Sequence, residues 1–193
     1  MTRTRTLSIT LATLLAVALP ALAGAAAQGA PLPAEYTGIL LDSSGAVTVP
    51  ITLHVDTLST PAEIARLSKE LGDHGPRAVM ADLATMPARG WIKVGDLMGF
   101  DVPVIREFPT PKGVEVFAVL DRPFPLFEQL KAIRSIDTPF GVVELTLDLN
   151  GNGHGLLYPA SRVMFTNEGK VEAIDQGAAS HRIIGVTQQL GVT

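Results

Sequence analysis

The sequence predicts a mostly β protein of the α+β class: a curled or closed antiparallel β-sheet (barrel-like) with an αα-hairpin inserted after the first β-hairpin. Short β-rich stretches with turn residues between them fill most of the chain. They follow one another closely, which favours antiparallel pairing because parallel neighbours need longer crossovers. About nine such strands in up-and-down order leave two exposed edges unless the sheet closes on itself. A split sheet with a helical layer is the alternative architecture.

The first 27 residues are predicted to be a secretory signal peptide. Arg3 and Arg5 precede an apolar run from Leu7 to Leu19, and the small residues from Ala23 to Ala27 offer cleavage sites, of which we choose Ala27. The apolar run is shorter than the roughly 20 residues that span a bilayer. We therefore expect an exported protein, periplasmic or extracellular, that does not span a membrane once it is processed.

Composition indicates the domain organisation of the mature chain and excludes several classes of protein. Residues 28–34 are expected to be a flexible leader and residues 35–190 one β-rich domain. The 193 residues include no cysteine, which excludes a disulfide scaffold and thiol chemistry. Acidic residues outnumber basic ones, 19 against 15, and the basic ones are dispersed. This pattern indicates that the protein does not bind nucleic acid.

The domain is predicted to begin with a β-hairpin. Residues 36–41 and 47–55 are β-rich and flank the turn cluster Asp42 to Gly45. Ile51, Leu53 and Val55 alternate with polar residues, which is the period of a strand with one apolar face.

Two helices are predicted to follow the hairpin. Thr60-Pro61-Ala62-Glu63 combines a capping hydroxyl, a proline at the first helical position and a glutamate three residues after the cap. This helix is expected to end at residues 72–75. Pro76 can open a second helix, with Val79, Leu83 and Met86 facing inward, and Pro87 can stop it.

The rest of the domain is predicted to consist of strands. Leu126 to Arg134 is ambiguous, because its apolar spacing fits a helix whereas Phe124-Pro125 favours an extended start. The expected strands are residues 90–95, 102–108, 114–120, 141–148, 155–165, 171–178 and 182–188.

One turn resembles half of a calcium loop. Asp148, Asn150 and Asn152 place oxygen side chains at positions one, three and five, with Gly153 at position six, but the bidentate glutamate expected at position twelve is Pro159. A glycine-rich hairpin turn is the alternative explanation, and it is the one we favour. Calcium is thus the only cofactor that the sequence suggests.

A charged cluster with aromatic neighbours is the candidate ligand site. Acidic and basic side chains beside two phenylalanines can line the mouth of a pocket, and loop salt bridges are the alternative. The candidate residues are Asp121, Arg122, Phe124, Phe127 and Glu128.

Catalytic signals are weak. No Gly-x-Ser-x-Gly elbow and no Ser-x-x-Lys motif occurs. His54 and Asp56 share one face of a predicted strand, where they can contribute to a metal site or a proton relay, or simply form a polar outer face. A hydrolase that uses Asp121, Glu128 or His54 as acid or base is therefore an alternative hypothesis.

Four segments carry a resemblance to other proteins. The chain resembles a group of exported bacterial proteins to which no activity is assigned, so the resemblance implies no cofactor and no catalytic residue. The segments are residues 36–42, 59–63, 121–123 and 139–148.

These observations lead to a functional hypothesis. We expect an exported β-rich domain that binds a small apolar or amphipathic molecule, or an envelope protein, at a mouth framed by the helix pair and residues 121–134. The hydrolase and a purely structural envelope protein are the alternatives.

Overall fold

The computed structural model describes residues 31–41, 48–124, 138–166, 169–176 and 180–190. The ambiguous segment Leu126 to Arg134 lies outside the described residues. The elements are β1 (Ala34–Leu41), β2 (Thr48–Val55), α1 (Pro61–His74), α2 (Pro76–Leu83), β3 (Gly90–Val94), β4 (Phe100–Val102), β5 (Val104–Thr110), β6 (Gly113–Val119), β7 (Phe140–Asp148), β8 (Asn152–Phe165), β9 (Val171–Gln176) and β10 (His181–Leu190).

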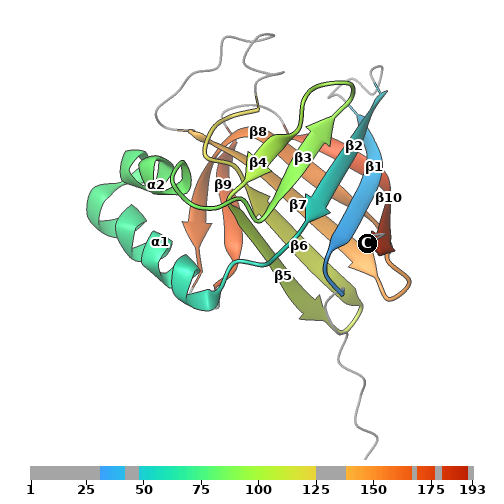
Figure 1. Cartoon of the computed structure of the whole chain (residues 1–193), viewed down its shortest axis with the longest axis horizontal. Coiled ribbons are helices and arrows are strands. Elements are labelled where there is room, and N and C mark those ends of the chain that lie inside the picture. The colour runs from blue at the N-terminus through green and yellow to red at the C-terminus, as the bar shows by residue number, and fades with distance from the viewer. Residues whose placement is uncertain (1–30, 42–47, 125–137, 167–168, 177–179, 191–193) are drawn as a thin grey trace, which may run out of the picture.

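The strands form one antiparallel sheet that curls into a nearly closed barrel (Figure 1). Nine of them follow the order β4-β3-β2-β1-β10-β8-β7-β6-β5, and every pair is antiparallel. The two ends of this order, β4 and β5, are consecutive in the chain and separated only by Pro103. A single bent strand therefore joins the two ends of the sheet, which confirms the predicted curled architecture.

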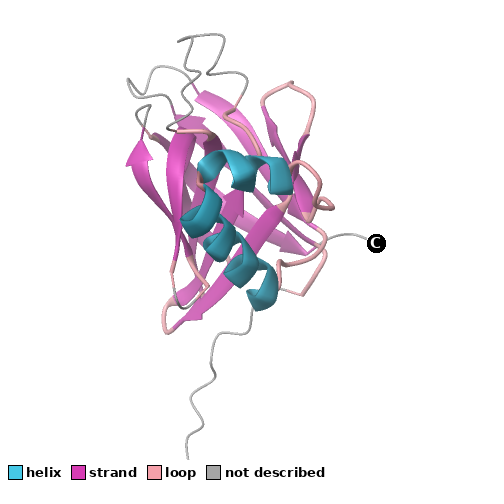
Figure 2. Cartoon of the chain, turned by 90° about the vertical axis from the view of Figure 1, so that its left-hand side faces the viewer, coloured by secondary structure: helices cyan, strands magenta, loops and turns pink. Residues whose placement is uncertain are grey.

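Apolar side chains fill the inside of the barrel and a second layer outside it. The strand period sends alternate residues inward, and the inner cluster draws on strands all around the wall, with Tyr36, Ile92, Val116 and Leu157 as members. The outer cluster joins both helices to one side of the wall, and Figure 2 shows the helices lying across these strands. Its buried members are Ile64, Leu67, Val79, Leu83, Val104, Phe117, Val119, Phe140, Val142, Tyr158, Val163, Phe165 and Val171.

The helix pair begins where the sequence predicts. The Thr60 side chain accepts a hydrogen bond from the Glu63 N–H, and the Glu63 carboxylate accepts one from the Thr60 N–H, which completes the capping box. The first helix continues through Gly72 to His74, and Gly75, with a φ of 80°, separates the two helices. The structure contains no helix, within the described ranges, that is long and apolar enough to cross a membrane.

β9 departs from the simple up-and-down order. It pairs with the second half of β8, so this hairpin lies outside the nine-strand path. The free edge of β9 is covered by a carboxylate of the barrel wall, because Glu144 on β7 accepts a hydrogen bond from the backbone N–H of Ala173. Glu144 also accepts one from the Tyr158 hydroxyl at 3.2 Å. A charged side chain placed against a free edge protects that edge from further pairing.

Replacing Glu144 with glutamine should leave the protein at least as stable at neutral pH. Burial is the largest influence on Glu144 and raises its pKa, so the unfolded chain releases this proton at a lower pH than the folded one. The stability that the group contributes is therefore lost as the pH rises through its folded pKa. Glutamine has the same shape and carries no charge, and its carbonyl oxygen can accept the hydrogen bond from Ala173 while its amide group donates to the Tyr158 oxygen.

Urea unfolding of E144Q at neutral and at mildly acidic pH tests this expectation. Glu115→Gln is the matched control, because Glu115 forms an ion pair with Lys170 at 2.7 Å that the change removes. At neutral pH we expect E144Q to have a higher free energy of unfolding than the parent protein. E115Q should show no such increase. A clear loss of stability in E144Q at neutral pH would contradict the expectation.

Candidate functional site

The bend at Pro103 opens a seam in the barrel wall. Before the bend β4 pairs with β3, and after it β5 pairs with β6, so each half of this strand has one edge without a strand partner among the described residues. Proline has no N–H to give to a ladder, and it occurs at strand ends and bulges for that reason.

The β5 side of the seam is sealed by one buried serine. The Ser59 N–H donates to the Ile105 carbonyl at 2.8 Å, and the Ile105 N–H donates to the Ser59 hydroxyl at 3.2 Å. The Arg106 guanidinium donates to the Ser59 carbonyl at 2.8 Å. Ser59 is only 1 % exposed, so it takes the place of a strand neighbour for β5.

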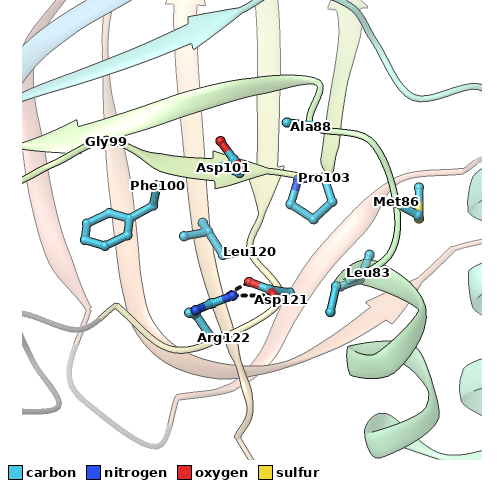
Figure 3. Close-up of a pocket in the computed structure, with 11 residues that line it drawn as sticks. Leu83, Met86, Ala88, Gly99, Phe100, Asp101, Pro103, Leu120, Asp121 and Arg122 are labelled. Carbon is cyan, nitrogen blue, oxygen red and sulfur yellow. Dashed lines mark hydrogen bonds and ion pairs between the residues drawn. The ribbon is translucent and has the colours of Figure 1, made fainter.

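The β4 side of the seam holds a pocket of about 280 Å³, which we call the seam pocket (Figure 3). It lies between β4, the segment after β6 and the end of α2. Its lining residues are Leu83, Ala84, Met86, Ala88, Gly99, Phe100, Asp101, Pro103, Leu120, Asp121 and Arg122.

The lining combines an apolar floor with one ion pair. Leu120 belongs to the inner cluster of the barrel and Leu83 to the outer cluster, so the pocket reaches both apolar layers. The Arg122 Nε and Nη2 atoms each donate to one Asp121 oxygen at 2.8 Å. The Asp121 side chain is 14 % exposed and that of Arg122 is 62 % exposed, so the pair spans from the pocket wall to solvent.

The structure brings two of the five predicted ligand residues into this pocket. Asp121 and Arg122 line it, whereas Phe124 is 1 % exposed and packs in the inner cluster. Phe127 and Glu128 lie outside the described residues. The other lining residues, among them Phe100, Asp101 and Pro103, were not named as ligand residues from the sequence, and the one available signal was the proline within a predicted strand.

The glycine-rich segment forms the turn between β7 and β8. One Asp148 oxygen accepts hydrogen bonds from the N–H groups of Asn150 and Asn152, at 2.8 and 3.0 Å. These bonds lower the pKa of Asp148. Gly151 has a φ of 76°, which suits a tight turn. Asp148, Asn150 and Asn152 therefore lie on one turn, as both sequence hypotheses require, and the Asp148 oxygen is already engaged by backbone donors.

The predicted polar strand face is present on β2. The His54 Nε2 atom lies 3.2 Å from an Asp56 oxygen, and the Nδ1 atom lies 3.7 Å from a Glu35 oxygen. The imidazole stacks on the Trp91 ring with 5.2 Å between the ring centroids. The two carboxylates approach opposite nitrogens, so they cannot share one metal ion with His54. Among the described residues, no three His, Asp or Glu side chains are placed to hold a metal.

A second cavity, of about 360 Å³, lies between α1 and the tip of the β8–β9 hairpin. Its lining includes Ile64 and Ala65 from the helix and Thr166 and Gly169 from the hairpin. It lies apart from the seam and shares no lining residue with the seam pocket.

Comparison with known proteins adds no family to this description. No protein-family model, no curated protein and no solved structure matches the chain, so the likeness to a group of exported bacterial proteins stays a prediction.

Proposed function

We propose that this protein binds a small apolar or amphipathic ligand, or the apolar side chains of a partner protein, in the seam pocket. The observation that supports the proposal is a gap in the barrel wall that reaches apolar side chains of both layers and has one ion pair at its rim. Binding sites commonly combine an apolar lining with a few polar groups that fix orientation.

The chemistry of the lining indicates how such a ligand would lie. Its apolar part would cover Leu83, Met86 and Phe100, which removes apolar surface from water. Its polar end would meet the Asp121–Arg122 ion pair. Phe100 is half-buried and packs against the inner cluster, so it offers an aromatic face at the entrance.

The proposed setting is the periplasm or the outside of the cell. This part of the proposal rests on the predicted signal peptide, with its basic start, short apolar run and small residues at the cleavage site. The partner would then be a small molecule or an envelope protein.

Filling the seam pocket should weaken binding of an apolar probe. Ala84 lines the pocket, is exposed and has helical backbone angles at the end of α2, so tryptophan fits there without entering the core. We expect Ala84→Trp to weaken binding of the amphipathic dye ANS by tenfold or more, a loss of about 1.4 kcal/mol, in a fluorescence titration.

Ala81→Trp is the matched control. Ala81 is also exposed on α2, but it does not line the pocket. We expect A81W to bind the dye like the parent protein. Equal dye affinity in A84W and A81W, with both variants folded by circular dichroism, would overturn the proposed location.

A further inference from the structure

We propose that the seam pocket takes an extended peptide, which would complete the barrel wall as an added strand. This inference rests on the proposed function and specifies the ligand. It depends on two backbone edges that face the pocket from opposite sides, one on β4 and one on the segment that follows β6.

The first edge is the side of β4 that faces away from β3. The Val102 carbonyl accepts a hydrogen bond from the Arg89 N–H at 2.8 Å, so the peptide groups of Val102 point toward β3. In an antiparallel strand, successive residues direct their N–H and C=O groups to opposite edges. The N–H and C=O of Asp101 therefore point away from β3, toward the seam pocket that Asp101 lines.

The second edge belongs to residues 120–122. The Leu120 N–H donates to the Gly141 carbonyl, and the Gly141 N–H donates to the Arg122 carbonyl, both at 2.9 Å. Leu120 and Arg122 thus extend the pairing with β7, and the intervening Asp121 directs its N–H and C=O to the other side. No backbone hydrogen bond joins Asp121 to another residue that the structure describes.

The position of the Asp101 carboxylate supports this arrangement. Figure 3 shows the carboxylate directed away from Leu120 and Asp121, so Asp101 contributes its backbone to the pocket lining. The Asp121 carboxylate is held by Arg122. Both acidic residues thus leave backbone groups, which any peptide sequence can match, facing the opening.

The side chains around the pocket define the peptide further. Alternate side chains of an inserted strand would point to opposite faces. One face would meet Leu120 and Phe100 of the inner layer, and the other would meet Leu83 and Met86 beside α2. The inferred ligand is therefore an extended, uncharged segment with apolar side chains at adjacent positions. Such a strand gains affinity from its main chain and specificity from its side chains.

Paired peptides test this inference on the unmodified protein. The probes are capped hexapeptides built from valine, isoleucine, leucine and threonine, each paired with a copy that is N-methylated at alternate residues. N-methylation keeps the side chains but removes the N–H groups along one edge of the strand. We expect at least one peptide to bind in isothermal titration calorimetry, and its methylated copy to bind at least tenfold more weakly.

A proline variant tests the same contact from the protein side. Asp101→Pro removes the N–H that faces the seam, at an edge position where proline can be accommodated. Its affinity for the bound hexapeptide is compared with that of Asp101→Ala, which loses the same carboxylate and keeps the N–H. We expect D101P to bind at least tenfold more weakly than D101A.

The outcomes separate this inference from the proposed function. If no hexapeptide binds, or if methylated and unmethylated peptides bind equally, the peptide inference is overturned, while loss of ANS binding in A84W would still support a binding pocket. If D101P does not fold, the peptide pair on the parent protein decides alone. Equal affinities of a folded D101P and D101A would also overturn the inference.

Discussion

Replacing Gly90 with alanine is expected to destabilise the fold by about 3 kcal/mol, the upper range for overpacking in a filled core. Gly90 begins β3 and pairs with Val55 on one side and Val102 on the other. A Cβ atom at Gly90 would lie 1.9 Å from the His54 carbonyl oxygen. Because this oxygen belongs to the backbone, it can move only if the strands separate.

The hydrogen bonds beside Gly90 add to the effect of this clash. Next to Gly90, the Arg89 carbonyl accepts hydrogen bonds from the N–H groups of Asp56 and Thr57, and the Arg89 N–H donates to Val102. Separating the strands at Gly90 would strain these bonds, which hold the chain entering α1 against the seam. Since a domain of this kind is stable by roughly 5–15 kcal/mol, the loss would be a large share of the total.

Gly72→Ala is the control for the same chemical change. Gly72 lies within α1, and a Cβ atom there would meet nothing within 4 Å. Alanine is the better helix former, so G72A should gain roughly 0.5–1 kcal/mol. Urea unfolding followed by circular dichroism measures both variants, and a G90A midpoint close to that of the parent protein would show that the strands can part at little cost.

The local elements were predictable because their signals act over a few residues. The capping box at Thr60 and Glu63 is satisfied entirely within one helical turn, so sequence alone marks the start of α1. The end of α1 at His74, with Gly75 as its cap, falls within the predicted residues 72–75, and Gly72 itself is tolerated in a helix that packs through Ile64 and Leu67. Tertiary packing compensates there for a weak helix former.

The seam was harder to predict from the sequence, because it depends on how strands that are distant in the chain are placed. Pro103 lies inside a stretch that reads as one strand, and proline there signals an edge or a bend. Its consequence, that Asp101 and Asp121 line the same opening, follows only once the sheet has closed. The charged pair at 121 and 122 and a mouth beside the helix pair were therefore predicted, but the contribution of β4 to the pocket was not.

Phe124 illustrates the same limit on a single side chain. Two charged residues, Asp121 and Arg122, lie shortly before it in the sequence, which suggested a position at the mouth of a pocket. In the fold, its N–H donates to the Pro159 carbonyl, and its ring packs over Gly141, where a Cβ atom would be 2.8 Å from the ring. The missing side chain at Gly141 makes room for the ring, and this pairing across 17 positions leaves no local sequence signal.

A buried tyrosine and glutamate form the main polar contact inside the barrel. The Tyr36 hydroxyl donates to Glu107 Oε1 at 2.7 Å, and the residues are 2 % and 8 % exposed. Burial, followed by the adjacent Glu107, raises the pKa of Tyr36 well above its usual range. A polar pair in such a setting is costly to break, because the remaining partner loses a hydrogen bond that water does not replace.

Replacing Tyr36 with phenylalanine should therefore cost about 1–3 kcal/mol at neutral pH. It should also change the response to alkali. Above about pH 10 the unfolded tyrosine releases its proton while the folded one keeps it, so this contribution to stability is lost as the pH rises. Unfolding free energies measured across the alkaline range should fall less steeply in Y36F than in the parent protein, by about 1.4 kcal/mol per pH unit.

Glu107→Gln shows whether the loss in Y36F comes from the buried carboxylate. If it does, adding E107Q to Y36F removes the charge that phenylalanine leaves without its hydroxyl donor, and part of the neutral-pH loss is recovered. In the parent protein the glutamine carbonyl can still accept a hydrogen bond from Tyr36. E107Q should therefore change the free energy of unfolding less there than it does in the Y36F background. Two results together would contradict this coupling: additive effects of the two changes, and alkaline stability curves that run parallel in Y36F and the parent protein. Tyr36 would then stabilise the barrel only through its ring.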